Sequence, residues 1–277
     1  SGFDWEFILL LLINTVISLA LFTLSIIYFF TEAARTTRET GKKTIMASAL
    51  ICAAAILNAI ITRYAVTFPE TELYDMNSDF IFITNIITAI IGFFTYICYI
   101  RAGQSLAFYG GIPGSLLLAE RTEPVKISWK WILFPMPLLI FWSFICFTIF
   151  PADPTELVYA TTPEGDGIMV YVYAFLSTAV LAPVQEEILY RHFIMGLFSK
   201  WFGSSKLAVA LNIGLSALIF SIAHAGIVTE DWIKILQVLP LGILFGFINR
   251  KKGLEHSVLT HSLFNTVIMI ISMLFEK

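Results

Sequence analysis

The sequence "IMVYVYAFLSTAVLAPVQEEILYRHFIMGLFS", residues 168–199, is an apolar run of membrane-spanning length that contains three charged side chains. A transmembrane helix needs about 20 consecutive apolar residues, and this run exceeds that length. If they were unpaired at mid-membrane, Glu186, Glu187 and Arg191 would together raise the free energy of membrane insertion by about 8–10 kcal/mol. The surrounding apolar side chains would lower it by roughly 6 kcal/mol. The three charges must therefore be satisfied inside the protein.

The composition of the whole chain is that of a membrane protein. Its 277 residues are 58% hydrophobic and 13% charged, and the mean hydropathy is +0.83, values outside the range of soluble domains. The net charge is −3, and the basic residues form short clusters rather than a broad surface, so nucleic acid is excluded as a partner. Cys52, Cys98 and Cys146 lie in separate apolar runs without a CxxC pair, and we interpret them as packing residues.

The apolar runs predict an all-α fold, a polytopic membrane helical bundle with about eight transmembrane helices and a buried polar cavity. The expected spans are about 7–30, 44–62, 80–100, 131–150, 168–199, 207–227, 232–249 and 254–275. We expect a single membrane domain over residues 1–277. Within it, residues 1–150 would form four N-terminal spans and residues 168–275 a core that carries the motifs.

Lysine and arginine alternate between the connections of these spans. Basic residues gather in segments 31–43, 101–130, 200–206 and 250–252, whereas segments 63–79, 151–167 and 228–231 are acidic overall. The positive-inside rule then places both chain termini on the extracytoplasmic side. We expect an integral, multi-pass protein of the plasma membrane in a prokaryote or of the endoplasmic reticulum in a eukaryote.

The charges in the fifth span divide into a pair and a single carboxylate. Glu187 and Arg191 are four residues apart, so on a helix they can form an ion pair. Glu186 is left over, and an unpaired carboxylate at low dielectric has the property of a general base. Pro183 is expected to bend the helix and open space beside it. The alternative is that the glutamates only hold helices together.

Two later spans carry polar side chains every four residues, a spacing that places them on one helix face. The two polar stripes are Asn212, Ser216, Phe220 and His224 in the sixth span, and Ser257, His261 and Asn265 in the eighth. Such stripes also commonly join the helices of a bundle. With Glu186 they offer a base, two imidazoles and an amide, the minimum set for hydrolysing an amide bond. His192, which points away from Arg191 on a helix, and His256, which we expect near the membrane interface, stay outside this set.

The predicted chemistry is water attack on a carbonyl. Glu186, with His224 beside it, can hold and deprotonate a water molecule, while His261 and Asn265 can donate hydrogen bonds to the oxyanion. No serine has a GxSxG setting, and the cysteines lie far from the motif, so no covalent nucleophile is expected.

Three motifs in this order carry a resemblance to a known family. They are EExxxR at Glu186, Glu187 and Arg191, FxxxH from Phe220 to His224, and HxxxN from His261 to Asn265. Together they resemble the CPBP intramembrane protease family, also called ABI, which includes the type II CAAX prenyl endopeptidases related to Rce1. The resemblance covers about residues 168–275. It implies that Glu186 activates water, that His224 is its partner, that His261 and Asn265 bind the oxyanion, and that Glu187 and Arg191 support the site.

The family has been discussed both as metalloproteases and as glutamate proteases. Two histidines and a carboxylate, here Glu186, His224 and His261, could hold Zn²⁺ with an open position. The sequence has no HExxH pair, however, and a metal on Glu186 would leave Glu187 as the remaining base. We therefore favour a glutamate-type protease without a cofactor over a zinc metalloprotease.

The resemblance implies removal of a C-terminal tripeptide from a prenylated CAAX protein. A prenylated or other membrane-associated peptide could enter between helices, because its lipid partitions into the bilayer. The expected partners are thus the lipid bilayer and such a peptide. One alternative is a proton-coupled transporter, which should show repeated halves. Another is a non-catalytic scaffold or immunity protein of the same family, in which Gly242 and Gly246 contact a partner helix.

The expected span boundaries place Glu186 and His224 at different depths in the membrane, although the proposed chemistry needs them side by side. Glu186 would lie near mid-depth, but His224, 18 residues after Lys206, would lie about 27 Å along its helix. We expect segment 191–206 to resolve this by dipping and returning as an amphipathic helix, with Phe193, Leu197 and Trp201 on its apolar face.

Overall fold

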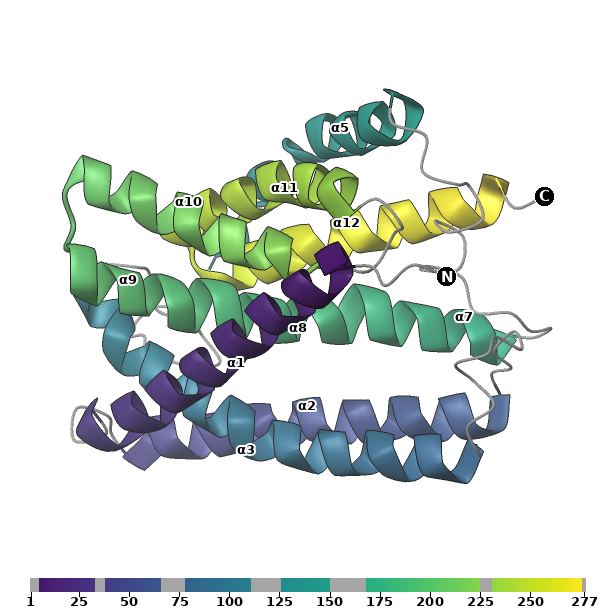
Figure 1. Ribbon diagram of the computed structural model, residues 1–277, viewed down its shortest axis with the longest axis horizontal. Helices are drawn as coiled ribbons and strands as arrows, with labels where there is room; N and C mark the ends of the chain where they lie inside the picture. The colour runs from purple at the N-terminus through teal and green to yellow at the C-terminus, as the bar shows by residue number, and fades with distance from the viewer. Residues whose placement is uncertain are drawn as a thin grey trace.

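The computed structural model describes residues 5–32, 38–65, 78–110, 126–149, 168–224 and 231–275, and every regular element in these ranges is helical (Figure 1). Seven helices are long and apolar enough to cross a membrane, and Lys206–Ile222 is a shorter apolar helix. The predicted all-α bundle of about eight membrane helices is confirmed. The elements are α1 (Trp5–Glu32), α2 (Arg38–Ala65), α3 (Ser78–Gly110), α4 (Trp129–Leu133), α5 (Met136–Ile149), α7 (Ile168–Ala174), η2 (Phe175–Leu181), α8 (Ala182–Glu187), η3 (Ile188–Ile194), α9 (Met195–Phe202), α10 (Lys206–Ile222), α11 (Asp231–Lys252) and α12 (Leu254–Phe275).

A single helical rod, Ile168–Phe202, crosses the middle of the molecule (Figure 1). It contains α7, α8 and α9, joined by the π-helical segments η2 and η3, and the backbone stays right-handed helical at each junction. Pro183 does not break this rod. It lies in the first turn of α8, where a missing backbone N–H is tolerated. The π-helical turns flank the glutamates, and such turns occur frequently at functional sites.

The expectation of a separate amphipathic helix over 191–206 is wrong. The rod is 35 residues long, about 52 Å, and its Phe193 and Leu197 are fully buried rather than interfacial. The length of the rod also explains how Glu186 and His224 come to lie at the same depth. Glu186 lies 16 residues before Phe202, about 24 Å along the rod, and His224 lies about 27 Å along the returning helix, so the two residues reach the same level.

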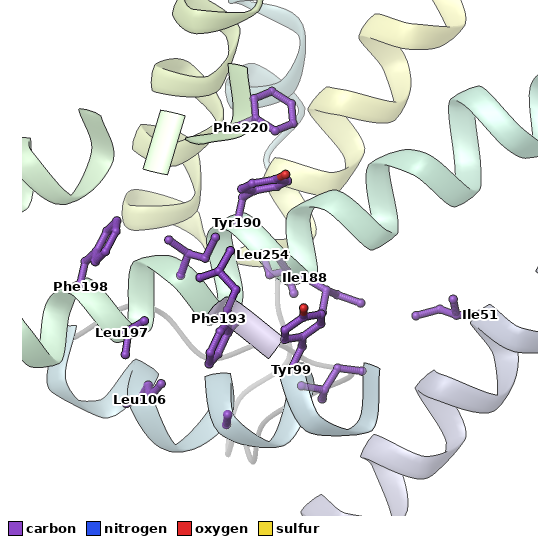
Figure 2. Close-up of a cluster of buried hydrophobic side chains, with 14 of the residues drawn as sticks. Ile51, Tyr99, Leu106, Ile188, Tyr190, Phe193, Leu197, Phe198, Phe220 and Leu254 are labelled. Atoms are coloured by element: carbon purple, nitrogen blue, oxygen red, sulfur yellow. The ribbon is translucent and has the colours of Figure 1, made fainter. Parts of the chain in front are cut away.

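The rod packs against α3 through small residues at a close crossing. A Cβ on Gly103 of α3 would lie 2.4 Å from Cδ2 of His192, and a Cβ on Gly196 would lie 3.0 Å from Cβ of Leu106. Figure 2 shows the adjoining apolar cluster, in which Phe193 of the rod lies beside Tyr99 of α3, with ring centroids 5.3 Å apart. Glycine at such a crossing permits the approach of two membrane helices.

The helices after the rod fold back along it through two short turns. Gly203 and Gly253 adopt positive φ angles of 81° and 97°, which glycine accepts without steric cost, and Ser205 caps α10 by accepting a hydrogen bond from the Ala208 N–H. Asn212 of α10 donates to the carbonyl of Met195 at 2.8 Å. Part of the predicted polar stripe therefore joins α10 to the rod.

Candidate functional site

Glu187 lies at the centre of a buried polar network. Its side chain has no exposed surface. Oε1 accepts a hydrogen bond of 3.0 Å from Nδ1 of His261. Oε2 accepts a hydrogen bond from the Ser257 hydroxyl and lies 3.4 Å from Nε of Arg191. Both oxygens are thus engaged, and the ion pair that the sequence spacing predicts is present.

Arg191 is enclosed on the other side by α10 and α11. Its side chain is fully buried, its Nη2 donates to the carbonyl of Gly242 at 3.2 Å, and its guanidinium lies 4.4 Å from the ring centre of Phe220. The ring face stabilises the cation. The pair of Glu187 and Arg191 therefore joins the rod to α10, α11 and α12.

Glu186, the next residue, has a different environment. Its side chain is 27% exposed, and its oxygens face two imidazoles. Oε1 lies 3.9 Å from Nε2 of His224, and Oε2 lies 3.7 Å from Nε2 of His261. Both separations are longer than a direct hydrogen bond. The structure therefore brings Glu186, His224 and His261 together across a small gap.

Hydrogen bonds at Nδ1 fix the orientation of the two imidazole rings. Nδ1 of His224 is 2.7 Å from the carbonyl of Phe220, and because a carbonyl only accepts, Nδ1 must carry the proton. Nδ1 of His261 likewise donates to Glu187. His261 is also stacked on Phe245, with ring centroids 4.6 Å apart. Both rings consequently point Nε2 at Glu186.

Asn265 lies one turn beyond His261 on α12. Its Nδ2 donates to the carbonyl of Thr178 at 2.8 Å, a contact that joins α12 to η2. A primary amide has two N–H groups, so this contact engages one of them.

Three residues near Glu186 were missed by the sequence analysis. Lys234, Tyr96 and Tyr190 all lie within electrostatic reach of the Glu186 carboxylate. Lys234 donates to Oε1 of Gln237 at 3.1 Å. The sequence could have pointed to Lys234, because it is the single charged residue within the apolar run 232–249. The tyrosines gave no signal in a chain with many aromatic residues.

The other two histidines have structural contacts. Nε2 of His192 lies 3.1 Å from the carbonyl of Ile100, across the close crossing with α3. His256 is 2% exposed and therefore buried within the protein. Its Nε2 accepts a hydrogen bond of 3.0 Å from the Ser128 N–H, which ties α12 to the start of α4.

The side chains of this cluster are of the types that bind zinc, but among the described residues no group of three or more His, Cys, Asp or Glu side chains is placed to hold a metal ion. Glu186, His224 and His261 form a set of two imidazoles and one carboxylate, which is typical of zinc ligands. Each Nδ1 is oriented by a carboxylate or a backbone carbonyl, as is usual for metal-binding histidines.

Comparison with known proteins bears on the part of the chain that forms this site. Residues 168–267 match the family model of the Rce1-like type II CAAX prenyl endopeptidases, which confirms the resemblance for this region. The chain is 29% identical to UPF0177 protein YaiF of Lactococcus lactis subsp. lactis (strain IL1403) over 155 residues, 52% of this chain and 66% of that protein. The aligned part is thus just under two thirds of that relative's length. No solved structure matches the chain.

These findings define the protein at a coarse level. The apolar helices and the family match identify an integral, multi-pass membrane protein. The family match covers residues 168–267, the part of the chain that carries Glu186, His224 and His261.

Proposed function

Taking the Rce1-like match of residues 168–267 as the premise, we propose that the protein is an endopeptidase in which Glu186 activates water. The observation that carries the proposal is the contrast between two adjacent carboxylates. Glu187 is engaged by Arg191, Ser257 and His261, whereas Glu186 faces two Nε2 atoms at 3.7 and 3.9 Å. Adjacent carboxylates in different environments commonly divide catalytic and supporting roles.

The proposed reaction needs one water molecule and no covalent intermediate with the enzyme. Glu186 takes a proton from the water as its oxygen attacks the peptide carbonyl. The resulting oxyanion collapses, the carbon–nitrogen bond breaks, and the same proton passes to the leaving nitrogen. The gap between Glu186, His224 and His261 suits a water molecule held by all three groups.

We assign oxyanion stabilisation to His261 and Asn265. Donation from Nε2 of His261 requires the imidazolium form, because its Nδ1 already donates to Glu187. The carboxylates of Glu186 and Glu187 together balance the positive charges of that imidazolium and of Arg191. Asn265 has a second amide hydrogen beyond the one that Thr178 accepts. Preorganised donors of this kind contribute strongly in a water-poor site.

The substrate in this proposal is a prenylated protein that ends in a CAAX sequence, from which the C-terminal tripeptide is removed. The test is to incubate the purified protein in liposomes with a farnesylated CAAX peptide and to identify the products by mass spectrometry. An intact tripeptide and a shortened farnesylated peptide are expected. Transport of the peptide without cleavage would instead favour the alternative of a proton-coupled transporter. A peptide without the lipid measures what the prenyl group contributes.

A zinc-dependent reaction is the second candidate, because both Nε2 atoms and Glu186 converge with zinc-ligand chemistry. Bound there, the metal would polarise the carbonyl or lower the pKa of a bound water. Against it, Glu187 is tied by three groups, so a metal on Glu186 would leave no free carboxylate as the base. A strong chelator should leave the cleavage rate unchanged. Loss of activity that zinc restores, with no loss from the metal-saturated chelator, would favour the metalloprotease.

A further inference from the structure

A cavity of about 520 Å³ lies between the α2–α3 pair and the first half of the central rod. Its walls come from α2, α3, α7, η2 and α8. The Rce1-like match begins at residue 168, so one wall of the cavity belongs to helices outside the matched region. In Figure 2, Ile51 of α2 lies apart from the other labelled side chains, and it is one of the residues that line the cavity.

The cavity follows from how the helices cross. The glycines at positions 103 and 196 bring α3 into close contact with η3 and α9 at one end of the rod. Towards the other end of the rod, α2 rather than α3 packs against α7 and η2. Beyond the close crossing α3 diverges from the rod, and the cavity lies between α2, α3 and the rod.

Glu186 does not line the cavity, but two of the lining residues are its neighbours. Gln185, the residue before Glu186, lines the inner end of the cavity, and so does Tyr96, which is within electrostatic reach of the Glu186 carboxylate. From Asn85 to Tyr96 the lining extends over about 16 Å of α3. An extended chain rises about 3.3 Å per residue, so this length corresponds to about five residues of substrate.

The lining combines apolar side chains with uncharged polar ones. None of the described residues that line it is charged, while amide side chains are supplied by Asn58, Asn85 and Gln185. Oδ1 of Asn58 is buried without a hydrogen-bond partner. Polar groups within membrane-spanning helices are costly unless another polar group satisfies them. The lining therefore suits a ligand that carries its own donors and acceptors along its length.

We infer that this cavity binds an extended, uncharged segment of the polypeptide substrate, next to the bond presented to Glu186. An extended peptide in the bilayer exposes backbone N–H and C=O groups, which must find partners. The amides and hydroxyls of the lining supply them. A prenyl chain has no polar groups and would leave the Asn58 amide oxygen unsatisfied, so the lipid of a lipidated substrate lies elsewhere. This inference rests on the proposed hydrolysis at Glu186 and is tested with the proposed CAAX substrate.

A native cysteine in the wall provides the test. Cys52 lines the cavity, and substitution of Cys98 and Cys146 by alanine would leave it as the single thiol of the chain. The Glu186→Gln substitution is added to prevent turnover. The rate at which the Cys52 thiol reacts with N-ethylmaleimide is then measured with and without ligands. The farnesylated CAAX peptide and its unprenylated form should each slow labelling several-fold, whereas farnesylcysteine methyl ester should not. Protection by the lipid compound alone, or no protection by either peptide at saturation, would overturn the inference.

Matched substitutions on α3 provide a second readout. Thr88 lines the cavity, and the adjacent Ile87 is 51% exposed and not part of the lining. Thr88→Trp should raise KM for the peptide several-fold, whereas Ile87→Trp should leave it unchanged. Equal KM values in both variants would remove the cavity from the substrate path. Because cysteine protection reports binding without cleavage, failure of the hydrolase proposal would be recognised separately, as absent turnover in the wild type.

Discussion

At the scale of single residues, the buried pair of Glu187 and Arg191 makes the strongest demand on stability. Arg191→Met should lower the free energy of unfolding by about 3–5 kcal/mol, because it leaves a buried carboxylate without its cation. Thermal unfolding in detergent measures this. The exposed pair of Arg63 and Asp79 is the control, since Arg63→Ala should cost about 0–1 kcal/mol. Equal losses in the two variants would mean that burial does not determine the energetics of these pairs.

His224 permits a kinetic prediction at the same scale. Its Nδ1 is held by the Phe220 carbonyl, so Nε2 is the atom that can exchange a proton at the site. His224→Gln should lower kcat by about 10²–10⁴-fold, the contribution expected of a group in proton transfer, with little change in the unfolding temperature. A normal kcat would assign this histidine a purely structural role.

At the scale of helices, the crossing of α3 and the rod depends on two glycines, of which Gly103 makes the tighter contact. Gly103→Ala would place a Cβ 2.4 Å from His192, and overpacking of this kind costs about 1–3 kcal/mol. The control is Gly214→Ala in α10, where a Cβ meets nothing within 4 Å and alanine is the better helix former by about 1 kcal/mol. Calorimetry should therefore find opposite shifts for the two variants. A neutral Gly103→Ala would show that the helices can separate at this crossing.

The helices also show what the sequence could and could not predict. Apolar run lengths located the spans, and the four-residue spacings placed Glu187 beside Arg191 and His224 on an inward face. Run length does not reveal where a helix meets water, so the continuation of the rod to Phe202 was missed. The Asn265 bond to Thr178 spans 87 residues and depends on how α12 packs on η2, which local spacing does not encode.

At the scale of the whole molecule, the lysine and arginine distribution predicts an orientation. The turn at 203–205 should face the cytoplasm, and the start of α3 should face the opposite side. With the native cysteines removed, Asp79→Cys should react with an impermeant thiol reagent in intact cells, and Ser204→Cys only after permeabilisation. The reverse pattern would invert the topology.

The central claim is that Glu186 is the base that activates water. The most direct measurement is the cleavage rate of the farnesylated CAAX peptide by Glu186→Gln, compared with the wild type and with Glu255→Gln, a carboxylate of α12 outside the site. The account predicts that Glu186→Gln loses at least about 10²–10⁴-fold in rate, while its unfolding temperature and the activity of Glu255→Gln stay at wild-type values. Cleavage by Glu186→Gln at the wild-type rate would contradict it.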